Sequence, residues 1–476
     1  MKLGFNQLRR YFGNRETVHQ NKRFEDPGLY HYQRSGDGWQ SRIHLRMDPD
    51  GRGILLVNAS HVFHLNPTAA LMARMALEEI PKAQAVDILQ KTYSVRRNQA
   101  QVDYQAFQAQ LVELVRPDGA CPIHELDLET TAPFSARPSA PYRMDLALTY
   151  RCNNDCAHCY NPREQASDYG QPTAGGQSAV RDQRSIELTT VEWKRILDIL
   201  WDLAIPHVVF TGGEPTLRPD LPELVAYAQS KGQITGLNTN ARRLSDRRYV
   251  LELVDAGLDH VQITLESHDP TIHDQMVTAR GAWQQTVAGI QNALETRLFV
   301  MTNTTMLQEN SPSLGKTLDF LAQLGIPTVG LNALIYSGRG ASVGSGLPES
   351  HLVPLLELAR QKTEAHGQRL IWYTPTQYCN FDPMQLDLGV KGCTAALYNM
   401  CIEPNGDVLP CQSYYHALGN LLIDSWNHIW NHQLAVSLRE RQNVAEKCQV
   451  CELLAECGGG CPLLFEKNQI RERDKP

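Results

Sequence analysis

The chain has 476 residues, of which 42% are hydrophobic and 20% are charged. At about 150 residues per domain this length predicts about three domains, and the composition excludes bulk disorder. The 45 Lys and Arg against 52 Asp and Glu give a formal net charge of −7, which disfavours non-specific binding to nucleic acid. No run of about 18 apolar residues occurs, and the first residues lack the apolar core of a signal peptide. We therefore expect a cytoplasmic protein with no nucleic-acid and no membrane partner.

The N-terminal part of the chain predicts one small module. Residues 1–50 are polar and irregular, and we assign them no function. Residues 51–116 predict a winged-helix-like unit of two short strands, at Ile54–Asn58 and His61–Leu65, followed by three helices. The first helix has a strong start signal in Asn66-Pro67, because Asn caps free backbone N–H groups and Pro fits the first helical position.

A proline-rich linker over residues 117–141 leads to a different pattern. Over residues 142–340, strands alternate with helices, which predicts a parallel sheet with right-handed crossovers. The strands are expected at Arg143–Thr149, Val208–Thr211, Ile234–Thr239, Val261–Leu265, Leu298–Thr304 and Val329–Leu334. The helices are expected at Leu188–Leu203, Leu221–Lys231, Tyr249–Ala256, Trp283–Thr296 and Leu314–Leu324. The fold class is therefore α/β, with a partial (βα)6 TIM-like barrel whose site lies at the carboxyl ends of the strands.

Three local patterns complete the outline of the chain. Thr189 and Glu192 have the spacing of a capping box. The segment from Gln165 to Gln183 is rich in Gly, Ser and Gln and predicts a mobile loop, either a lid over the site or a disordered insertion. Over residues 341–476 the periodicity weakens and cysteines dominate, so we expect an irregular C-terminal domain.

The twelve cysteines carry the strongest chemical signal. In a large protein of a reducing compartment, clustered cysteines indicate metal ligands rather than disulfides. Cys152, Cys156 and Cys159 follow the first barrel strand as C-x3-C-x2-C. Three thiolates on one loop can hold three irons of a 4Fe–4S cluster and leave the fourth iron open. The alternative is a zinc site with His158 as the fourth ligand.

A second motif ends the second barrel strand, at Gly212, Gly213, Glu214 and Pro215. Two glycines let a backbone approach a ligand closely, and Glu214 offers a carboxylate to an amine. Such turns are common, but this one lies one βα unit after the cysteine loop, at the same end of the predicted sheet.

Together, Cys152, Cys156, Cys159 and the Gly212–Pro215 turn resemble the radical S-adenosylmethionine superfamily. The resemblance implies a partial βα barrel in which the open iron binds the amino and carboxylate groups of S-adenosylmethionine. One electron from an external donor, a flavodoxin or ferredoxin, would release a deoxyadenosyl radical that abstracts a substrate hydrogen. The resemblance also implies a set of cofactor contacts, for most of which a strand-end cap or turn is the alternative: Gly212, Gly213, Glu214, Pro215, Asn238, Asn240, Thr264 and Glu266.

The C-terminal cysteines carry a second resemblance. Cys393 is followed by Gly406 and Cys411, and then by Cys448-x2-Cys451-x5-Cys457-x3-Cys461. This pattern resembles the SPASM extension of peptide-modifying radical enzymes, which carries two auxiliary iron–sulfur clusters, whereas a zinc ribbon is the alternative. The resemblance assigns the first auxiliary cluster to Cys393, Cys401, Cys411 and Cys461. It assigns the second to Cys448, Cys451 and Cys457.

This chain departs from the SPASM pattern at its end. The usual final cysteine is missing between Cys461 and Pro476. Cys379 is spare and could complete the second cluster, or that cluster could be open or bound by an oxygen ligand. Cys121, in the linker, is interpreted as a structural thiol.

The N-terminal module carries a third resemblance. Ile54–Asn58 and the following His64–Ala69 are similar to the PqqD-like peptide-recognition domains related to the pyrroloquinoline quinone peptide chaperone. Such modules bind a leader peptide as an added edge strand. A DNA-binding winged helix is the alternative, but residues 51–115 hold six Lys and Arg against five Asp and Glu, which gives no electrostatic footprint for DNA.

These resemblances imply an enzyme with three 4Fe–4S clusters that modifies a ribosomally made precursor peptide, by crosslinking, epimerisation or backbone rearrangement. A maturase of a folded enzyme, of the formylglycine-forming type, is the second hypothesis. A non-catalytic zinc- or cluster-binding adaptor is the third. We assign no catalytic acid or base, since a structural role is the alternative for each candidate: His268, Asp269, His273 and Tyr336.

Overall fold

The computed structural model describes residues 24–36, 39–58, 61–115, 137–161, 187–442 and 444–464. These residues form two compact units, which we describe separately. The first holds the residues up to Ser139 together with Leu200–Pro206, and the second holds the remainder. Cys121 and the predicted Gln165–Gln183 loop lie outside the described residues.

The first unit is built on a four-stranded antiparallel sheet in the order β1-β2-β3-β4. The strands are β1 (Gly28–Gly36), β2 (Trp39–Met47), β3 (Gly53–Val57) and β4 (His61–Leu65). The sequence predicted the last two. β1 and β2 lie in the segment to which it assigned no role, because their mixed polar and aromatic residues show no clean alternation.

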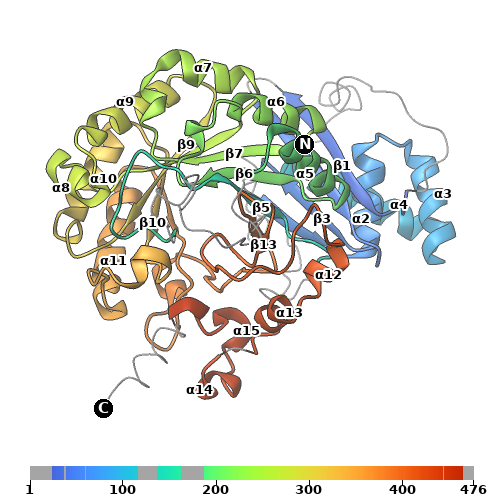
Figure 1. Ribbon diagram of the computed structural model, residues 1–476. Coiled ribbons are helices and arrows are strands. Elements are labelled where there is room, and N and C mark those ends of the chain that lie inside the picture. Colours follow the sequence, from blue (N-terminus) through green and yellow to red (C-terminus); the bar gives the residue numbers. More distant parts are fainter. Residues whose placement is uncertain are drawn as a thin grey trace, which may run out of the picture. The chain divides into compact units, whose positions relative to one another are not determined.

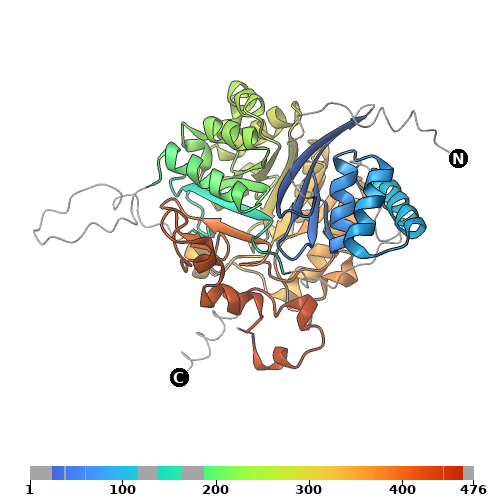
Figure 2. The ribbon, with the colours of Figure 1, turned by 90° about the vertical axis from the view of Figure 1, so that its right-hand side faces the viewer.

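Three helices cover one face of this sheet (Figure 2). They are α2 (Pro67–Leu77), α3 (Lys82–Tyr93) and α4 (Arg97–Leu114). The predicted start of α2 is confirmed, since Asn66 Oδ1 accepts a hydrogen bond of 2.9 Å from the Ala69 N–H. Fully buried Leu45 and Leu55 of the sheet share one core with Met75 of α2.

The second unit is built on a nine-stranded sheet in the order β11-β10-β9-β8-β7-β6-β5-β12-β13. β5 to β12 run parallel to their neighbours, and only β13 is antiparallel. Its strands are β5 (Arg143–Thr149), β6 (His207–Gly212), β7 (Ile234–Thr239), β8 (His260–Thr264), β9 (Phe299–Thr305), β10 (Thr328–Asn332), β11 (Arg369–Trp372), β12 (Asn399–Ile402) and β13 (Val408–Leu409). The six predicted strands are therefore confirmed, and the sheet forms the predicted partial barrel.

Helices lie along the outer side of the curved sheet (Figure 1). They are α5 (Thr190–Asp202), α6 (Leu221–Lys231), α7 (Arg247–Asp255), α8 (Pro270–Val277), α9 (Ala282–Leu294), α10 (Leu314–Gln323) and α11 (Glu349–Ala365). Met144, Leu146 and Leu148 of β5 are fully buried, as expected for a parallel strand covered on its outer face. No helix among the described residues is long and apolar enough to cross a membrane.

The C-terminal region is less separate from the barrel than its sequence suggests. β11, β12 and β13 all lie beyond residue 341, and they extend both ends of the barrel sheet. The remaining elements are short helices: α12 (Trp426–Trp430), α13 (Gln433–Arg439), α14 (Glu446–Gln449) and α15 (Leu454–Cys457). Such short elements carry little periodicity, which explains why the sequence indicated only an irregular domain.

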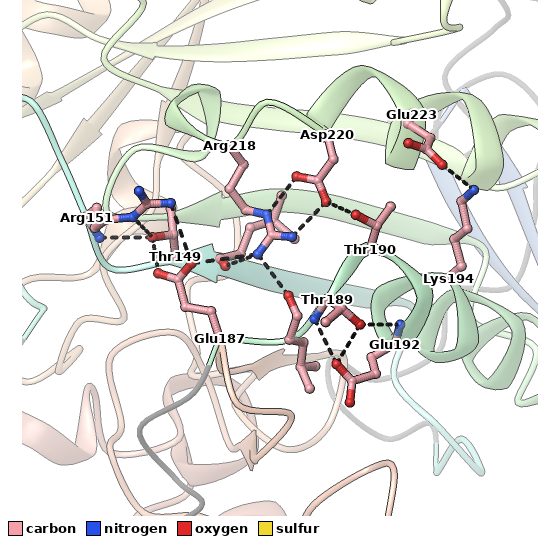
Figure 3. A network of polar contacts seen from close by, with 12 residues as sticks. Thr149, Arg151, Glu187, Thr189, Thr190, Glu192, Lys194, Arg218, Asp220 and Glu223 are labelled. Carbon is pink, nitrogen blue, oxygen red and sulfur yellow. Dashed lines mark hydrogen bonds and ion pairs between the residues drawn. The ribbon is translucent and has the colours of Figure 1, made fainter. Parts of the chain in front are cut away.

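A polar network holds the start of α5 against the carboxyl end of β5 (Figure 3). Thr189 and Glu192 form the predicted capping box, with the Thr189 N–H donating to Glu192 Oε2 at 2.8 Å. Buried Arg218 donates to the Leu188 carbonyl at 3.0 Å. Glu187 accepts a hydrogen bond from the Thr149 hydroxyl, just before the cysteine loop. Glu187 is thereby fixed to the end of β5, where the cysteine loop begins.

Candidate functional site

The three cysteines of the first motif lie on the loop that leaves β5. Cys152, Cys156 and Cys159 are each partly exposed. The Asn154 N–H donates to Cys152 Sγ at 3.4 Å, and the Asn240 carboxamide, beyond β7, donates to the same sulfur at 3.9 Å. N–H donors directed at a thiol sulfur are the surroundings that iron–sulfur ligands use.

The two glycines of the second motif make room for the cysteine loop. The Gly213 N–H donates to the Thr149 carbonyl at 2.7 Å. A Cβ at Gly213 would lie 2.4 Å from the Arg151 oxygen and 2.6 Å from the Tyr150 oxygen, closer than real Cβ contacts come. Gly212 has a φ of +136°, and its Cβ would lie 2.2 Å from the Thr149 oxygen. The sequence pointed to close approach of a ligand here, and in the structure the close neighbour is the cysteine loop itself.

Glu214 is fully buried and joins the ends of two strands. Its carboxylate accepts hydrogen bonds from the Thr216 hydroxyl at 2.6 Å, the Thr239 hydroxyl at 2.7 Å and the Asn240 N–H at 2.8 Å. Burial raises the pKa of Glu214, while these donors oppose the shift. Because Asn240 also contacts Cys152, Glu214 fixes the position of a donor to the cysteine loop. Pro215 starts the short turn that presents Thr216.

Glu266 is also buried and binds the cysteine loop directly. Its Oε1 lies 3.0 Å from Nε2 of His158, and its Oε2 accepts from the Thr305 N–H at 2.9 Å. Burial lowers the pKa of His158, but the neighbouring Glu266 carboxylate raises it by more, so the pKa lies above its usual value. The sequence placed Glu266 near the cofactor pocket, and the structure places it against the residue between two of the cysteines.

The remaining polar candidates on the barrel strands lie elsewhere. Asn238 of β7 and Gln262 of β8 are register partners, and both line a cavity. Neither carboxamide has a hydrogen-bond partner within the described part of the chain. Thr264 ends β8, next to Asn303 of β9 in register. Sequence reasoning missed Gln262, although its position two residues before Thr264 puts both on the same face of the strand.

The cavity has a volume of about 570 Å³ and lies inside the second unit. An ion pair on β5 lines it, in which Arg143 Nε lies 2.7 Å from Asp145 Oδ1. Burial raises the pKa of Asp145, and the Arg143 charge opposes the shift. Sequence reasoning missed this pair. Charged residues at alternate positions of an otherwise apolar strand are the signal that could have revealed it. Four aromatic side chains also form part of the cavity wall: Tyr336, Trp372, Tyr373 and Tyr398.

Three of the four cysteines predicted for the first auxiliary cluster line this same cavity: Cys393, Cys411 and Cys461. Burial raises the pKa of Cys393 and Cys411. Cys401 lies instead on β12, is 1% exposed, and packs with Ala147 and Leu409 in a small apolar cluster. Its S–H donates to the Ile402 carbonyl at 3.7 Å.

The four candidate acids and bases have different surroundings. Asp269 caps α8, where its Oδ1 accepts from the Thr271 N–H at 2.7 Å. His273 is buried and accepts from a backbone N–H through Nδ1, and His268 contacts a threonine hydroxyl. Tyr336 is the one of the four that lines the cavity.

The cysteine sets have the thiolate donor chemistry that iron–sulfur clusters require. Among the residues the structure describes, no three His, Cys, Asp or Glu side chains converge on a position for one metal ion. A 4Fe–4S cluster makes a different demand, because each thiolate binds a separate iron. His158, the fourth ligand of the zinc alternative, contacts Glu266 through Nε2.

Comparison with known families accounts for the three parts of the chain. Residues 146–321 match the radical SAM superfamily. Residues 393–452 match SPASM, an iron–sulfur cluster-binding domain, and residues 44–114 match coenzyme PQQ synthesis protein D, PqqD. The three resemblances drawn from the sequence are thereby confirmed.

The match to two curated relatives extends over most of the length of each relative. PqqA peptide cyclase of Bradyrhizobium diazoefficiens is 30% identical over 333 residues, 67% of this chain and 81% of the relative. Fe-coproporphyrin III synthase of Methanosarcina barkeri is 28% identical over 340 residues, 66% of this chain and 81% of the relative.

A solved structure shows the same fold over nearly the whole chain. SuiB of Streptococcus suis, bound to the precursor peptide SuiA, matches with a TM-score of 0.62 at 16% identity, covering 89% of this chain and 95% of that chain. The family matches and the 30% identical relative decide the assignment. This chain belongs to the radical SAM superfamily and is an enzyme with a SPASM iron–sulfur domain and a PqqD-type module.

Proposed function

We propose that the enzyme modifies a ribosomally made precursor peptide, starting with abstraction of a hydrogen atom from one of its residues. The observation that carries this proposal is the presence of a PqqD-type module and a radical SAM barrel in one chain. One relative is named for cyclising the peptide PqqA, and the similar fold of SuiB was solved with a precursor peptide.

The first unit would bind the leader of that peptide. β4 has one strand neighbour, β3, among the described residues, so its outer edge can accept a further strand. Val62 on β4 is 42% exposed and is therefore accessible on this edge strand. Main-chain hydrogen bonds along this edge would supply affinity, and contacts around Val62 would add selectivity.

The cysteine loop would hold the radical-generating cluster through Cys152, Cys156 and Cys159. When bound, the cluster and S-adenosylmethionine supply the deoxyadenosyl radical. Asn240 and Glu266 position the loop, the first by donating to Cys152 and the second by binding His158. The cofactor contacts proposed for Gly212–Pro215, Asn238 and Thr264 rest on the family resemblance.

The cavity would receive the segment of peptide that is modified. The Arg143–Asp145 pair is neutral as a unit, and a charged guest beside it would be buried without compensation. The carboxamides of Asn238 and Gln262 each offer a donor and an acceptor, which complements a peptide group. This lining favours a neutral peptide segment, with its side chains against the aromatic wall.

Three 4Fe–4S clusters in all would follow from the cysteine sets, with about twelve irons per chain. The SPASM cysteines that line the cavity would put an auxiliary cluster beside the peptide, where it can accept an electron from the product radical. A flavodoxin or ferredoxin would supply the first electron, in the cytoplasm.

Leader binding can be tested with Val62→Asp. We expect this change to weaken binding at least tenfold, because a charge replaces an apolar contact at the edge that receives the leader. Calorimetry would use the full chain and a peptide from a short reading frame beside the gene. Val191→Asp on α5, where Val191 is 76% exposed, is the matched control and should bind as the wild type does. If Val62→Asp bound the peptide as tightly as Val191→Asp does, the assignment of β4 as the leader-binding edge would be contradicted.

A further inference from the structure

The second auxiliary cluster has three cysteines in the SPASM pattern and needs a fourth ligand. Cys448 lies on α14, Cys451 follows it, and Cys457 ends α15. The described chain places one further cysteine beside them, Cys379, which is exposed and follows β11.

Short contacts hold the segment before Cys379 against Cys457. The Tyr378 N–H donates to Cys457 Sγ at 3.3 Å, and the Cys457 thiol donates to the Thr376 carbonyl at 3.5 Å. One residue away, Gln377 Nε2 donates to the Gly459 carbonyl at 3.1 Å. The backbone next to Cys379 is therefore fixed at the sulfur of a cysteine from the SPASM set.

A separate contact brings Cys379 to the other end of that set. Lys447 Nζ lies 3.7 Å from Cys379 Sγ, and Lys447 immediately precedes Cys448. The Lys447 ammonium would offset the charge of bound thiolates.

Three glycines follow Cys457 and lie between it and Cys461, a cysteine of the first auxiliary cluster. Gly458, Gly459 and Gly460 have φ values of +64°, +77° and +82°, a left-handed path that other residues rarely take. A Cβ at Gly460 would lie 2.8 Å from Gln377 Cγ. Before this turn, Cys457 contacts the segment that follows β11. After it, Cys461 lines the barrel cavity with Cys393 and Cys411.

We propose that Cys379 is the fourth protein ligand of the second auxiliary cluster, supplied by the segment after β11. This rests on the proposed function only in assuming two auxiliary clusters. Each of the four thiols would release its proton to become a ligand. The ligand set is then Cys379, Cys448, Cys451 and Cys457.

The test compares full-length Cys379→Ala, Cys379→Ser and wild type after anaerobic reconstitution with ferrous iron and sulfide. We expect the Ala variant to show a three-iron auxiliary cluster, or to fall from about twelve irons to about eight, by Mössbauer and EPR spectroscopy. The Ser variant, whose hydroxyl can still ligate, should keep more iron with a shifted spectrum. Cys121→Ala removes a thiol assigned to no cluster and should match the wild type. Wild-type iron content and spectra in Cys379→Ala would overturn the proposal.

A second measurement needs no variant. In the apo protein the exposed Cys379 should react with iodoacetamide, and after reconstitution it should be protected, as read by mass spectrometry of its peptide. Equal alkylation in both states would also overturn the proposal. Loss of deoxyadenosine formation in the wild type, with Cys379 protected, would refute the proposed function and leave the ligand assignment standing.

Discussion

At the scale of single residues, buried polar groups connect the cysteine loop to the barrel. Glu214 holds Asn240, which donates to Cys152, and Glu266 binds His158. From the sequence, the family resemblance made both glutamates candidates for cofactor contacts. Their hydrogen-bond partners could not be predicted. Each glutamate lies far in sequence from its partner, and whether the two meet depends on how the strands are aligned.

A buried histidine pair in the barrel predicts a pH dependence of stability. His260 Nε2 lies 2.8 Å from His207 Nε2, so at least one ring is neutral. Burial, with the Arg143 charge, lowers the pKa of His260 to about 4. The unfolded chain then binds a proton near pH 6.5 that the folded chain does not. This stabilising contribution is complete above that pH and is lost as the pH falls towards 4, by about 3 kcal/mol.

We therefore expect His260→Gln to flatten the fall in unfolding free energy between pH 7 and pH 4.5. Urea unfolding of the apo protein, followed by circular dichroism, gives this slope. The matched control is His428→Gln, a change at an exposed position that should keep the wild-type slope. An unchanged slope in His260→Gln would show that another group causes the acid sensitivity.

At the scale of elements, the sequence predicted the strands and helices that have a clear hydrophobic periodicity or a capping residue. The six strands β5 to β10 and the start of α2 were found because each carries a complete local signal. β11 has four residues, and α11 contains Pro354 within the helix, so both lacked such a signal. The cysteine motifs could be recognised for a similar reason, because their spacings are fixed over short stretches of sequence. The cavity brings together residues from strands far apart in the sequence, and only the structure could reveal it.

The fit between the Gly-Gly turn and the cysteine loop gives a prediction at this scale. Gly213→Ala would press a methyl group against the Tyr150 and Arg151 carbonyls and displace the loop. We expect it to lower iron content by about four per chain, the loss of the radical-generating cluster. Gly315→Ala, where the added methyl meets the flexible end of Lys362, should keep the wild-type iron content. Full iron content in Gly213→Ala would refute the claim that this contact shapes the site.

At the scale of the whole molecule, the chain joins a module for binding a peptide to a barrel for radical chemistry. The four-stranded sheet and its helices form one compact unit, and the barrel with the SPASM cysteines forms the other. A leader bound to the first unit would raise the local concentration of the attached segment at the second. This division of labour explains how the cavity could accept a neutral peptide segment without strong sequence recognition of its own.

We propose above that the enzyme abstracts hydrogen from a precursor peptide. The most direct measurement is deuterium transfer, in which the reduced, reconstituted enzyme is given S-adenosylmethionine and a precursor peptide deuterated at carbon. We predict deuterium in the deoxyadenosine formed by the wild type, and no deoxyadenosine from the Cys152→Ala, Cys156→Ala, Cys159→Ala triple variant. A coproporphyrin added in place of the peptide should not be consumed. Deoxyadenosine without deuterium, or deoxyadenosine made by the triple variant, would contradict the account.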